Sequence, residues 1–303
     1  MKRWIVICVL GVFCESSSQW RPVPGELRYD EVCYLTSHNS YATTSYGYHY
    51  AQQNLPIPQQ LSYGVRGLKL DTYIVDGEVF LCHKGPRLTR LLCGGKAPQP
   101  FKEVLADIKQ FLDSNPTEVI TIFFETYVKR SDQEIDEPFR KSGLDRYILR
   151  PCDWNAADGI WPTHDWMRKH SKRLIIFYTK GSTELCFNEW QHLAENQWGV
   201  LHPGKACNER PESKAYRTFK RSLYLLNFFP MFKLNFDKGY HQINTTKLTT
   251  FLAQVLERGL STGSNKHLLP TFLSTDYIDI GDSLKQVIAI NERKQRERLS
   301  TIV

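Results

Sequence analysis

The sequence predicts an α/β fold, and the simplest architecture is a single-domain (β/α) barrel of the TIM type, whose closure need not be regular. Apolar runs of strand length alternate with amphipathic stretches along the 303 residues. This alternation is typical of a parallel sheet whose faces are covered by helices, and the length suits one barrel domain. Polar side chains gather where several apolar runs end, and a barrel of this kind carries its chemistry at those strand ends.

The individual elements follow from local patterns. Residues 65–73 and 79–82 are expected to be strands, because the turn-forming pair Asp76-Gly77 separates them. Residues 101–114 have apolar side chains at helical spacing, and Asn115-Pro116 ends that helix. Residues 188–212 are expected to be an irregular surface excursion. The other expected elements are a strand at 119–124, helices at 137–142 and 163–170, strands at 174–178 and 223–228, a helix at 247–258, a strand at 271–277 and a helix from residue 282.

The first eighteen residues predict export. Met1-Lys2-Arg3 precedes an apolar run of about ten residues, and small polar residues follow it, as in a secretory signal peptide. Residues 1–18 are therefore expected to be the signal, and residues 19–303 the barrel domain of a secreted protein. No later run reaches the roughly 20 apolar residues that a spanning helix needs. Asn244-Thr245-Thr246 is a glycosylation sequon, which is expected on the surface of an exported chain.

Six cysteines lie beyond the signal region, and an even number in an exported chain predicts disulfide bonds. Short separations and elimination favour three pairs: Cys82 with Cys93, Cys186 with Cys207, and Cys33 with Cys152. The first pair would close a loop beside His83 and stabilise the fold by about 3 kcal/mol on the chain-entropy model. A zinc site is not expected, because no close cysteine pair has metal-ligand spacing.

The formal net charge of +7 suits attraction to an anionic surface. An ordinary solvated basic surface explains the same excess, so the charge alone does not identify a partner.

Two histidines stand in ordered motifs. His38 lies in Ser37-His38-Asn39-Ser40-Tyr41, and His83 lies in Leu81-Cys82-His83-Lys84-Gly85. Cleavage of a phosphodiester that has a neighbouring hydroxyl needs a base, an acid, and positive charge on the phosphoryl oxygens. Two histidines can fill the first two roles, each worth about 10²- to 10⁴-fold in rate. Asn39, Asp71 and Glu125 are hard oxygen donors expected at the same strand-end rim, and such donors suit Ca²⁺.

These motifs resemble the X domain of phosphatidylinositol-specific phospholipase C (PI-PLC), and more narrowly its secreted, X-domain-only branch with a cysteine before the second histidine. The resemblance is dense from about residue 32 to residue 128 and looser beyond. The further motifs that carry it are Gly64-Val65-Arg66-Gly67-Leu68, Leu70-Asp71-Thr72-Tyr73, Asn115-Pro116-Thr117-Glu118 and Phe272-Leu273-Ser274-Thr275-Asp276-Tyr277.

The resemblance implies roles for these residues. His38 would deprotonate the inositol 2-hydroxyl to give a cyclic phosphodiester, and His83 would protonate the diacylglycerol oxygen. In calcium-dependent members of the family, the positions matching Asn39, Asp71 and Glu125 coordinate the metal. In metal-independent bacterial members an arginine replaces the ion and a late-strand aspartate steadies the first histidine. Asp276 is the candidate for that last role.

Lys69 departs from the family pattern, because calcium-dependent members carry a glutamate ligand at this position. An ammonium group cannot coordinate calcium, and strand alternation puts Lys69 on the same face as Asp71. Three explanations stay open: Lys69 itself supplies the cation, calcium binds with fewer protein ligands, or catalysis is impaired. Lys84 and Arg66 are further candidates for binding the phosphate, although Arg66 better suits a structural ion pair.

The leading hypothesis is a secreted phosphodiesterase of the phospholipase C type that cleaves phosphatidylinositol or a related inositol phosphodiester through His38 and His83. Its expected partner is a phosphoinositide or another anionic phospholipid at a membrane surface; no nucleic acid and no transmembrane segment are expected, and the chain is expected to be a monomer. An alternative is a catalytically silent lipid- or phosphate-binding module. A third hypothesis, a glycerophosphodiesterase or sphingomyelinase-D-like enzyme, ranks lowest because it requires paired acidic residues where Lys69 and Asp71 stand.

Overall fold

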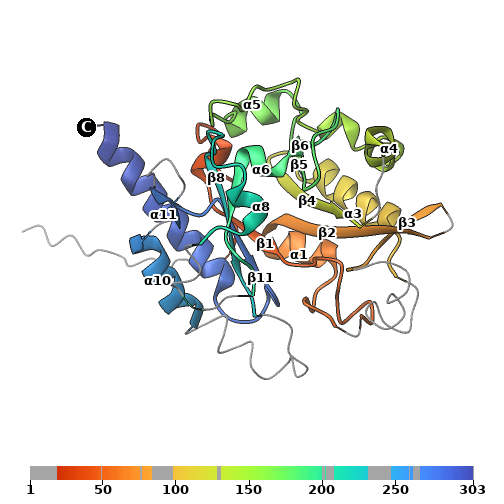
Figure 1. Ribbon diagram of the computed structural model, residues 1–303, viewed down its shortest axis with the longest axis horizontal. Coiled ribbons are helices and arrows are strands. Elements are labelled where there is room, and N and C mark those ends of the chain that lie inside the picture. The colour runs from red at the N-terminus through yellow and green to blue at the C-terminus, as the bar shows by residue number, and fades with distance from the viewer. Residues whose placement is uncertain are drawn as a thin grey trace, which may run out of the picture.

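The computed structural model describes residues 19–48, 50–75, 77–83, 98–127, 131–199, 202, 208–230, 247–258, 260–261 and 267–302. Within them, one sheet runs in the order β6-β5-β4-β2-β1-β11-β8-β7, with β3 paired to β2 (Figure 1). Its strands are β1 (Tyr34–Ser37), β2 (Val65–Val75), β3 (Glu78–Leu81), β4 (Ile120–Thr126), β5 (Leu174–Tyr178), β6 (Phe187–Asn188), β7 (Leu193–Glu195), β8 (Leu223–Phe228) and β11 (Phe272–Thr275). A separate short hairpin joins β9 (Leu260–Ser261) to β10 (His267–Leu268).

This strand order is that of a barrel followed around its circumference. Apart from the antiparallel hairpin strand β3, each strand of this sheet is parallel to its neighbours, and strands that follow one another in the sheet order mostly follow one another along the chain. The first strand, β1, pairs with the last, β11. In the described residues the path is open between β6 and β7, which α6 (Glu189–His192) connects. The predicted single-domain α/β barrel is therefore confirmed, and its irregularity is the missing pairing between the described strands β6 and β7.

The helices lie outside the sheet (Figure 1). Helix α1 (Ile57–Tyr63) packs against α3 (Phe101–Ser114) beside β2 and β3, and α11 (Ser283–Ile302) packs on β1 and β11. The remaining helical elements are η1 (Tyr29–Glu31), α4 (Asp132–Lys141), η2 (Asp145–Tyr147), α5 (His164–Lys169), α8 (Pro211–Lys214) and α10 (Leu248–Arg258).

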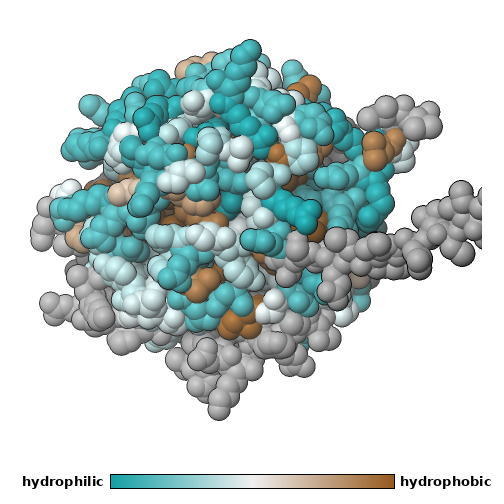
Figure 2. All heavy atoms as spheres, turned by 180° about the vertical axis from the view of Figure 1, so that it is seen from behind, coloured by the Kyte–Doolittle hydropathy of each residue, from teal (hydrophilic) through white to brown (hydrophobic). Residues whose placement is uncertain are grey.

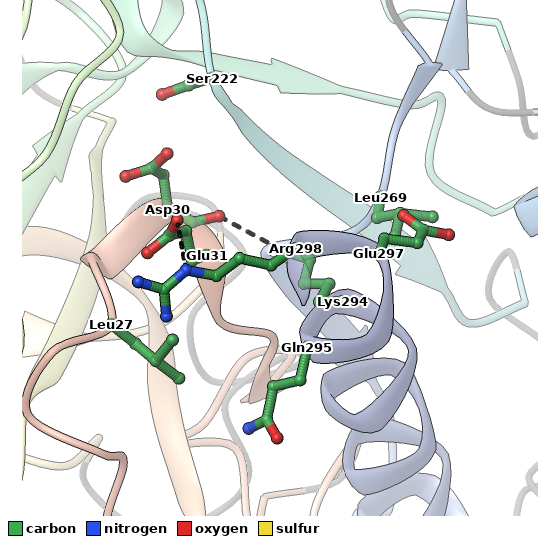
Figure 3. A pocket seen from close by; sticks show the side chains of 9 residues that line it. All are labelled: Leu27, Asp30, Glu31, Ser222, Leu269, Lys294, Gln295, Glu297 and Arg298. Carbon is green, nitrogen blue, oxygen red and sulfur yellow. Dashed lines mark hydrogen bonds and ion pairs between the residues drawn. The ribbon is translucent and has the colours of Figure 1, made fainter. Parts of the chain in front are cut away.

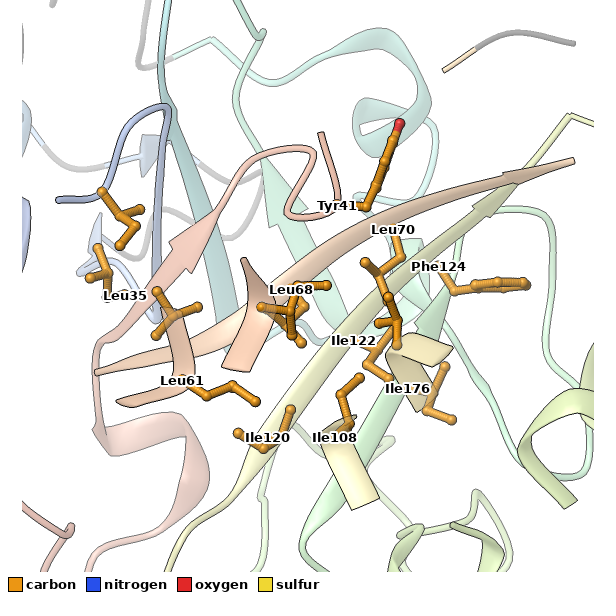
Figure 4. Close-up of a cluster of buried hydrophobic side chains, with 14 of the residues drawn as sticks. Leu35, Tyr41, Leu61, Leu68, Leu70, Ile108, Ile120, Ile122, Phe124 and Ile176 are labelled. Carbon is orange, nitrogen blue, oxygen red and sulfur yellow. The ribbon is translucent and has the colours of Figure 1, made fainter. Parts of the chain in front are cut away.

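Alternate residues of the strands face two different hydrophobic clusters. Leu68 and Leu70 of β2 belong to the cluster that also contains the buried side chains of α1 and α3 (Figure 4). Phe123 of β4 belongs to the other cluster, which has residues from most of the barrel strands and fills the barrel interior. Lys69 and Asp71 alternate with Leu68 and Leu70, so their side chains point into the barrel.

Polar contacts fasten the last helix to the start of the first strand at the amino end of the barrel. The Nζ of Lys294 on α11 donates to the carbonyls of Asp30 and Val32, both at 3.3 Å. Arg298, one turn further along α11, pairs with Glu31 at 3.6 Å across a pocket (Figure 3). The two ends of the described chain are therefore held together beneath β1.

The face shown in Figure 2 is mostly hydrophilic, with hydrophobic side chains in small separate groups. Among the described residues, the large hydrophobic side chains that are exposed are Ile160, Trp198, Phe219 and Leu299. None of the described helices is both long enough and apolar enough to cross a membrane.

Most elements predicted from the sequence are confirmed, several with the same bounds. The helix at 101–114 and the strands at 174–178 and 223–228 begin and end where expected. The irregular excursion expected at 188–212 is wrong in part, because α6, β7 and α8 lie within it. Two- and three-residue strands are too short to show an alternating pattern. The signal region 1–18 and the sequon at residues 244–246 lie outside the described residues.

Two of the three disulfide bonds predicted from the sequence are wrong. Cys33, Cys152 and Cys186 are free, so Cys33 does not pair with Cys152 and Cys186 does not pair with Cys207. Cys33 is buried at the start of β1, where its backbone N–H and carbonyl bond the amide of Asn291 on α11, whereas Cys152 is exposed. Cys82 is disulfide-bonded; its expected partner, residue 93, lies outside the described residues, and that pairing stays a prediction.

His164 is a buried structural histidine at the start of α5. Its Nδ1–H donates to the carbonyl of Leu27 at 2.7 Å, and its Nε2 accepts from the hydroxyl of Tyr34 at 2.9 Å. Burial lowers the pKa of His164 to about 4. The ordinary value is about 6.5, so on acidification the unfolded chain binds a proton at this side chain before the folded chain does.

We expect the free energy of unfolding to fall by about 2 kcal/mol when the pH is lowered from 7 to 5, because His164 binds a proton in the unfolded state but not in the folded state over this range. Chemical denaturation at both pH values measures this loss. The variant His164→Gln should be less stable than wild type at pH 7 but should lack this part of the pH dependence. Equal pH dependence in the two proteins would contradict the prediction.

Candidate active site

Polar side chains lie at the carboxyl ends of neighbouring barrel strands. His38 and Asn39 directly follow β1, and Asp276 directly follows β11. Asp71 and Glu125 are register partners near the end of the paired part of β2 and β4. Because these parallel strands are adjacent, their ends form one rim. The structure thus brings together residues that the sequence predicted to form one site.

The local chain after β1 explains how His38 reaches this rim. Asn39 has a φ of +41°, in the left-handed region that asparagine tolerates better than most residues, so the chain turns immediately after His38. The carbonyl of Asn39 accepts from the N–H of Ala42 at 2.8 Å, and the Ser37 hydroxyl donates to that of Ser40 at 2.7 Å. The Ser-His-Asn-Ser motif is thus a tight, self-bonded turn.

The imidazole of His38 is fixed on two sides. Its Nδ1 lies 2.7 Å from Oδ1 of Asp276, a side chain that is only 4% exposed. Its ring stacks on Phe229, with ring centroids 3.7 Å apart and planes at 3°. A carboxylate on Nδ1 makes that nitrogen the proton donor, so Nε2 is the nitrogen that can accept a proton in a reaction.

His83, which follows β3, has an equivalent carboxylate partner. Its Nδ1 lies 2.6 Å from Oδ2 of Asp71, and the hydroxyl of Tyr127 lies 2.9 Å from the same nitrogen. The hydroxyls of Tyr41 and Tyr127 both donate to Oδ2 of Asp71 at 3.4 Å. This arrangement again makes Nδ1 the donor and Nε2 the nitrogen that exchanges the reaction's proton.

The two histidines are connected through Asp71. Tyr41 lies three residues after His38 and bonds the carboxylate that holds His83. The backbone N–H of Ser40 donates to the carbonyl of Lys69 at 3.0 Å, which fastens the turn after β1 to β2. Both imidazoles are therefore held from adjacent strands at the same end of the barrel.

Lys69 lies within a network of polar side chains inside the barrel. Its Nζ donates to Oε1 of Glu195 at 3.1 Å and to Oδ1 of Asn227 at 3.3 Å. The other oxygen of Glu195 accepts from Nη1 of Arg210 at 2.9 Å. Glu195 is buried, and although burial raises its pKa, Lys69 and Arg210 together lower it to about 2. Arg210 also pairs with the exposed Glu212 at 3.0 Å, so the charges of Lys69, Glu195, Arg210 and Glu212 balance.

Two further carboxyl groups face this network. Burial, and then the charge of Glu195, raises the pKa of Glu189 to about 8, so Glu189 holds a proton at pH 7. Burial, and then the charge of Asp71, raises the pKa of Glu125 above its usual range. Negative charge at this end of the barrel is thus reduced below what the number of acidic residues suggests.

The donor set of Asn39, Asp71 and Glu125 offers at most five side-chain oxygens to a calcium ion. Calcium takes six to eight oxygen ligands, mostly from carboxylates, carbonyls and water. Here Oδ2 of Asp71 is occupied by His83 and the two tyrosines, and the side chain of Lys69 shares the same strand face.

Arg66 does not belong to the site, so its prediction as a phosphate-binding residue is wrong. It lies at the amino end of β2, and its side chain is only 5% exposed. Its Nε donates to Glu118 at 2.6 Å, and its Nη1 donates to the carbonyls of Leu61 and Val65 at 2.7 Å. Arg66 thus forms a structural ion pair. Lys84 lies outside the described residues.

Several residues of the site were not predicted from the sequence. Asn227 is a polar residue inside the otherwise apolar strand 223–228, and that exception could have indicated it. Glu195 and Arg210 lie in the stretch expected to be irregular. Tyr127 and Phe229 follow strand ends but belong to no local motif, so only the fold shows their contacts with the histidines.

The fold and the site define a parallel barrel with two carboxylate-bound histidines at the carboxyl ends of its strands. A family model described as PI-PLC X 1 matches residues 25–291. The chain belongs to the PI-PLC X domain family.

Curated relatives agree with this assignment. A PI-PLC X domain-containing protein of Arabidopsis thaliana is 28% identical over 264 residues, which are 83% of this chain and 59% of the relative. A protein of Arthroderma benhamiae named as an uncharacterized secreted protein is 23% identical over 265 residues, 84% of this chain and 58% of the relative. The chain thus spans less than two thirds of the length of these relatives.

Solved structures show the same fold. The phosphatidylinositol-specific phospholipase C from Listeria monocytogenes has a TM-score of 0.60 at 16% identity, covering 90% of this chain and 98% of that one. A mutant of the corresponding Staphylococcus aureus enzyme has a TM-score of 0.55 at 14% identity, covering 89% and 94%. At these identities the similarity concerns the fold.

We expect Glu195→Gln to lower the free energy of unfolding by about 3 to 5 kcal/mol, because it leaves the ammonium of Lys69 and the guanidinium of Arg210 without their shared buried anion. Urea denaturation at pH 7 measures the change. Glu212→Gln is the matched control: it removes an exposed partner of the same Arg210 and should cost less than about 1 kcal/mol. Similar losses in the two variants would show that Glu195 is not the anion on which the network depends.

Proposed function

We propose that this chain is a secreted phosphodiesterase that cleaves phosphatidylinositol or a related inositol phosphodiester by general acid–base catalysis. The observation that carries the proposal is the matched pair of imidazoles, each with Nδ1 bonded to a carboxylate: His38 with Asp276, and His83 with Asp71. A fold that only bound lipid would not require two histidines with fixed tautomers at one rim.

In the proposed reaction, Nε2 of His38 takes the proton of the inositol 2-hydroxyl, and that oxygen attacks phosphorus. The new P–O bond closes a cyclic phosphodiester while the bond between phosphorus and the diacylglycerol oxygen breaks. Nε2–H of His83 gives its proton to the departing oxygen. Asp276 and Asp71 stay ionised and stabilise the imidazolium form of their histidines, as in other carboxylate–histidine pairs.

We propose that Lys69 supplies the positive charge that calcium supplies in other members of the family. Its side chain points into the barrel, and Glu195 and Asn227 hold the ammonium group in place. Fixed positive charge near the phosphoryl oxygens stabilises the charge that develops on them in the transition state. The fixed position of the Lys69 ammonium on the strand face that also carries Asp71 supports this role, and an ion bound to Asn39, Asp71 and Glu125 is then not required.

Secretion and a membrane-bound substrate are parts of the same proposal. The predicted signal at residues 1–18, the disulfide-bonded Cys82 and the relative named as a secreted protein support an oxidising compartment outside the cell. The net charge of +7 suits an anionic phospholipid surface. The two solved structures with this fold are of phosphatidylinositol-specific phospholipases C, which supports that lipid as the first substrate to test.

We expect purified protein to hydrolyse phosphatidylinositol in mixed micelles, and His38→Ala and His83→Ala each to lower kcat by at least about 10²-fold, because each removes one proton-transfer group. Release of water-soluble inositol phosphate measures turnover. His170→Ala is the matched control, since His170 is exposed at the end of α5 and should leave kcat unchanged.

Two results would overturn the catalytic assignment. If the wild-type protein binds phosphatidylinositol vesicles but does not hydrolyse the lipid, the chain is a catalytically silent lipid-binding module. If the protein releases choline from lysolipid or sphingomyelin and does not hydrolyse phosphatidylinositol, it is a glycerophosphodiesterase or a sphingomyelinase-D-like enzyme.

We expect chelation to lower wild-type turnover only in part, and Lys69→Met to lower kcat by about 10²- to 10³-fold, because the fixed cation is lost. Turnover is measured across calcium concentrations in both proteins. Lys102→Met, which removes an exposed lysine paired with Glu78, is the control and should behave as wild type. Complete loss of wild-type turnover on chelation, with recovery on added calcium, would refute the role proposed for Lys69.

A further inference from the structure

The ring stack of His38 on Phe229 is closer and flatter than the other aromatic contacts in the described part of the chain. The ring centroids are 3.7 Å apart and the planes differ by 3°, whereas the packing of Phe228 against Phe251 next to it has centroids 4.6 Å apart at 50°. Core aromatic pairs usually prefer offset or edge-to-face geometry at larger separations. The contact at His38 is therefore that of a ring face covering an imidazole.

Phe229 is held firmly enough to impose this geometry. It is 4% exposed and directly follows β8. The next residue, Pro230, forms a bridge with Gly199 after β7, so neighbouring chain fixes the position of Phe229. Asp276 fixes the edge of the same imidazole through Nδ1. The hydrogen bond from Nδ1 to Asp276 alone would let the imidazole rotate about that hydrogen bond. The contact with the face of the Phe229 ring restricts this rotation.

The face of a phenyl ring carries partial negative charge and attracts a cation placed over it. In the proposed reaction His38 becomes an imidazolium ion when it takes the proton of the substrate hydroxyl. The electrostatic attraction of the phenyl face is greater for the charged imidazolium than for the neutral imidazole. Phe229 thus interacts more strongly with the protonated state.

We propose that Phe229 is a positioning residue for the catalytic base: its ring face holds the plane of the His38 imidazole and favours the imidazolium form. This inference rests on the proposed function, and it adds a residue that acts on the base without touching the substrate. Asp276 is the charged partner of His38, and Lys69 on β2 pairs with Glu195 on β7 inside the barrel; substitution at Phe229 replaces none of these residues.

The test replaces Phe229 in two ways. Phe229→Leu keeps an apolar side chain but removes the ring face. Pentafluorophenylalanine at position 229 keeps the shape of the ring and removes the negative charge of its face. Phe228→Leu and pentafluorophenylalanine at position 228 are the matched controls, because Phe228 is a buried neighbour that packs against Phe251 and not against His38.

We expect both changes at Phe229 to lower kcat by about 3- to 30-fold with KM unchanged, and to move the acid limb of the pH–rate profile down by about 0.5 to 1.5 pH units. The controls at Phe228 should lower stability without moving that limb. An unmoved limb in the pentafluorophenylalanine protein at position 229 would overturn the proposal, because simple packing is intact there.

A second measurement separates this inference from the proposed function. The ring signal of His38, identified by its absence in His38→Ala, is followed by NMR as the pH changes. We expect its midpoint to lie at lower pH in both Phe229 proteins than in wild type and in the Phe228 controls. Equal midpoints overturn the role of Phe229 whether or not the protein is active, whereas shifted midpoints without turnover uphold the stack and reject the enzyme.

Discussion

The site depends on the simultaneous pairing of β1 with β2 and with β11. Ser37 is level with Leu68 on one side and with Thr275 on the other, so the next residue, His38, emerges between Asp276 and the strand that carries Asp71. Gly67 permits this, because a Cβ there would lie 2.2 Å from the hydroxyl of Thr36 on β1. Because His38 follows β1 and Asp276 follows β11, their pair exists only when these two strands, far apart in the sequence, have paired.

Charge balance inside the barrel depends on the pairing of Lys69 with Glu195. A lysine on the inner face of β2 needs a buried anion, and Glu195 at the end of β7 supplies one that also binds Arg210. Lys69 lies on β2 in the middle of the strand path and Glu195 lies on β7 at one end of it, so the network crosses the barrel interior. The side chains that bind the ammonium of Lys69 thus come from parts of the sequence more than a hundred positions away.

The sequence predicted the features that local pattern determines. Helix 101–114 and strands 174–178 and 223–228 have strong periodicity or long apolar runs, and their bounds were correct. His38, His83, Asp71 and Asp276 stand in motifs at strand ends, so their common rim could also be expected. The short strands β6 and β7 have no readable period, and the free state of Cys33, Cys152 and Cys186 depends on distances that only the fold sets. The position of Arg66 at the wrong end of β2 follows from counting along the strand, which the motif alone does not reveal.

The two histidines differ in ways that match their proposed roles. The side chain of His38 is 20% exposed and is fixed by Asp276 and Phe229, whereas that of His83 is 51% exposed at the end of the β2–β3 hairpin, next to the disulfide-bonded Cys82. A base that aligns an attacking hydroxyl with phosphorus gains from a rigid, enclosed ring, because small misalignments lower the rate strongly. An acid that protonates a lipid leaving group must lie where the diacylglycerol can depart towards a membrane. The enclosed histidine therefore suits the base and the exposed one the acid, an assignment that geometry supports independently of the family pattern.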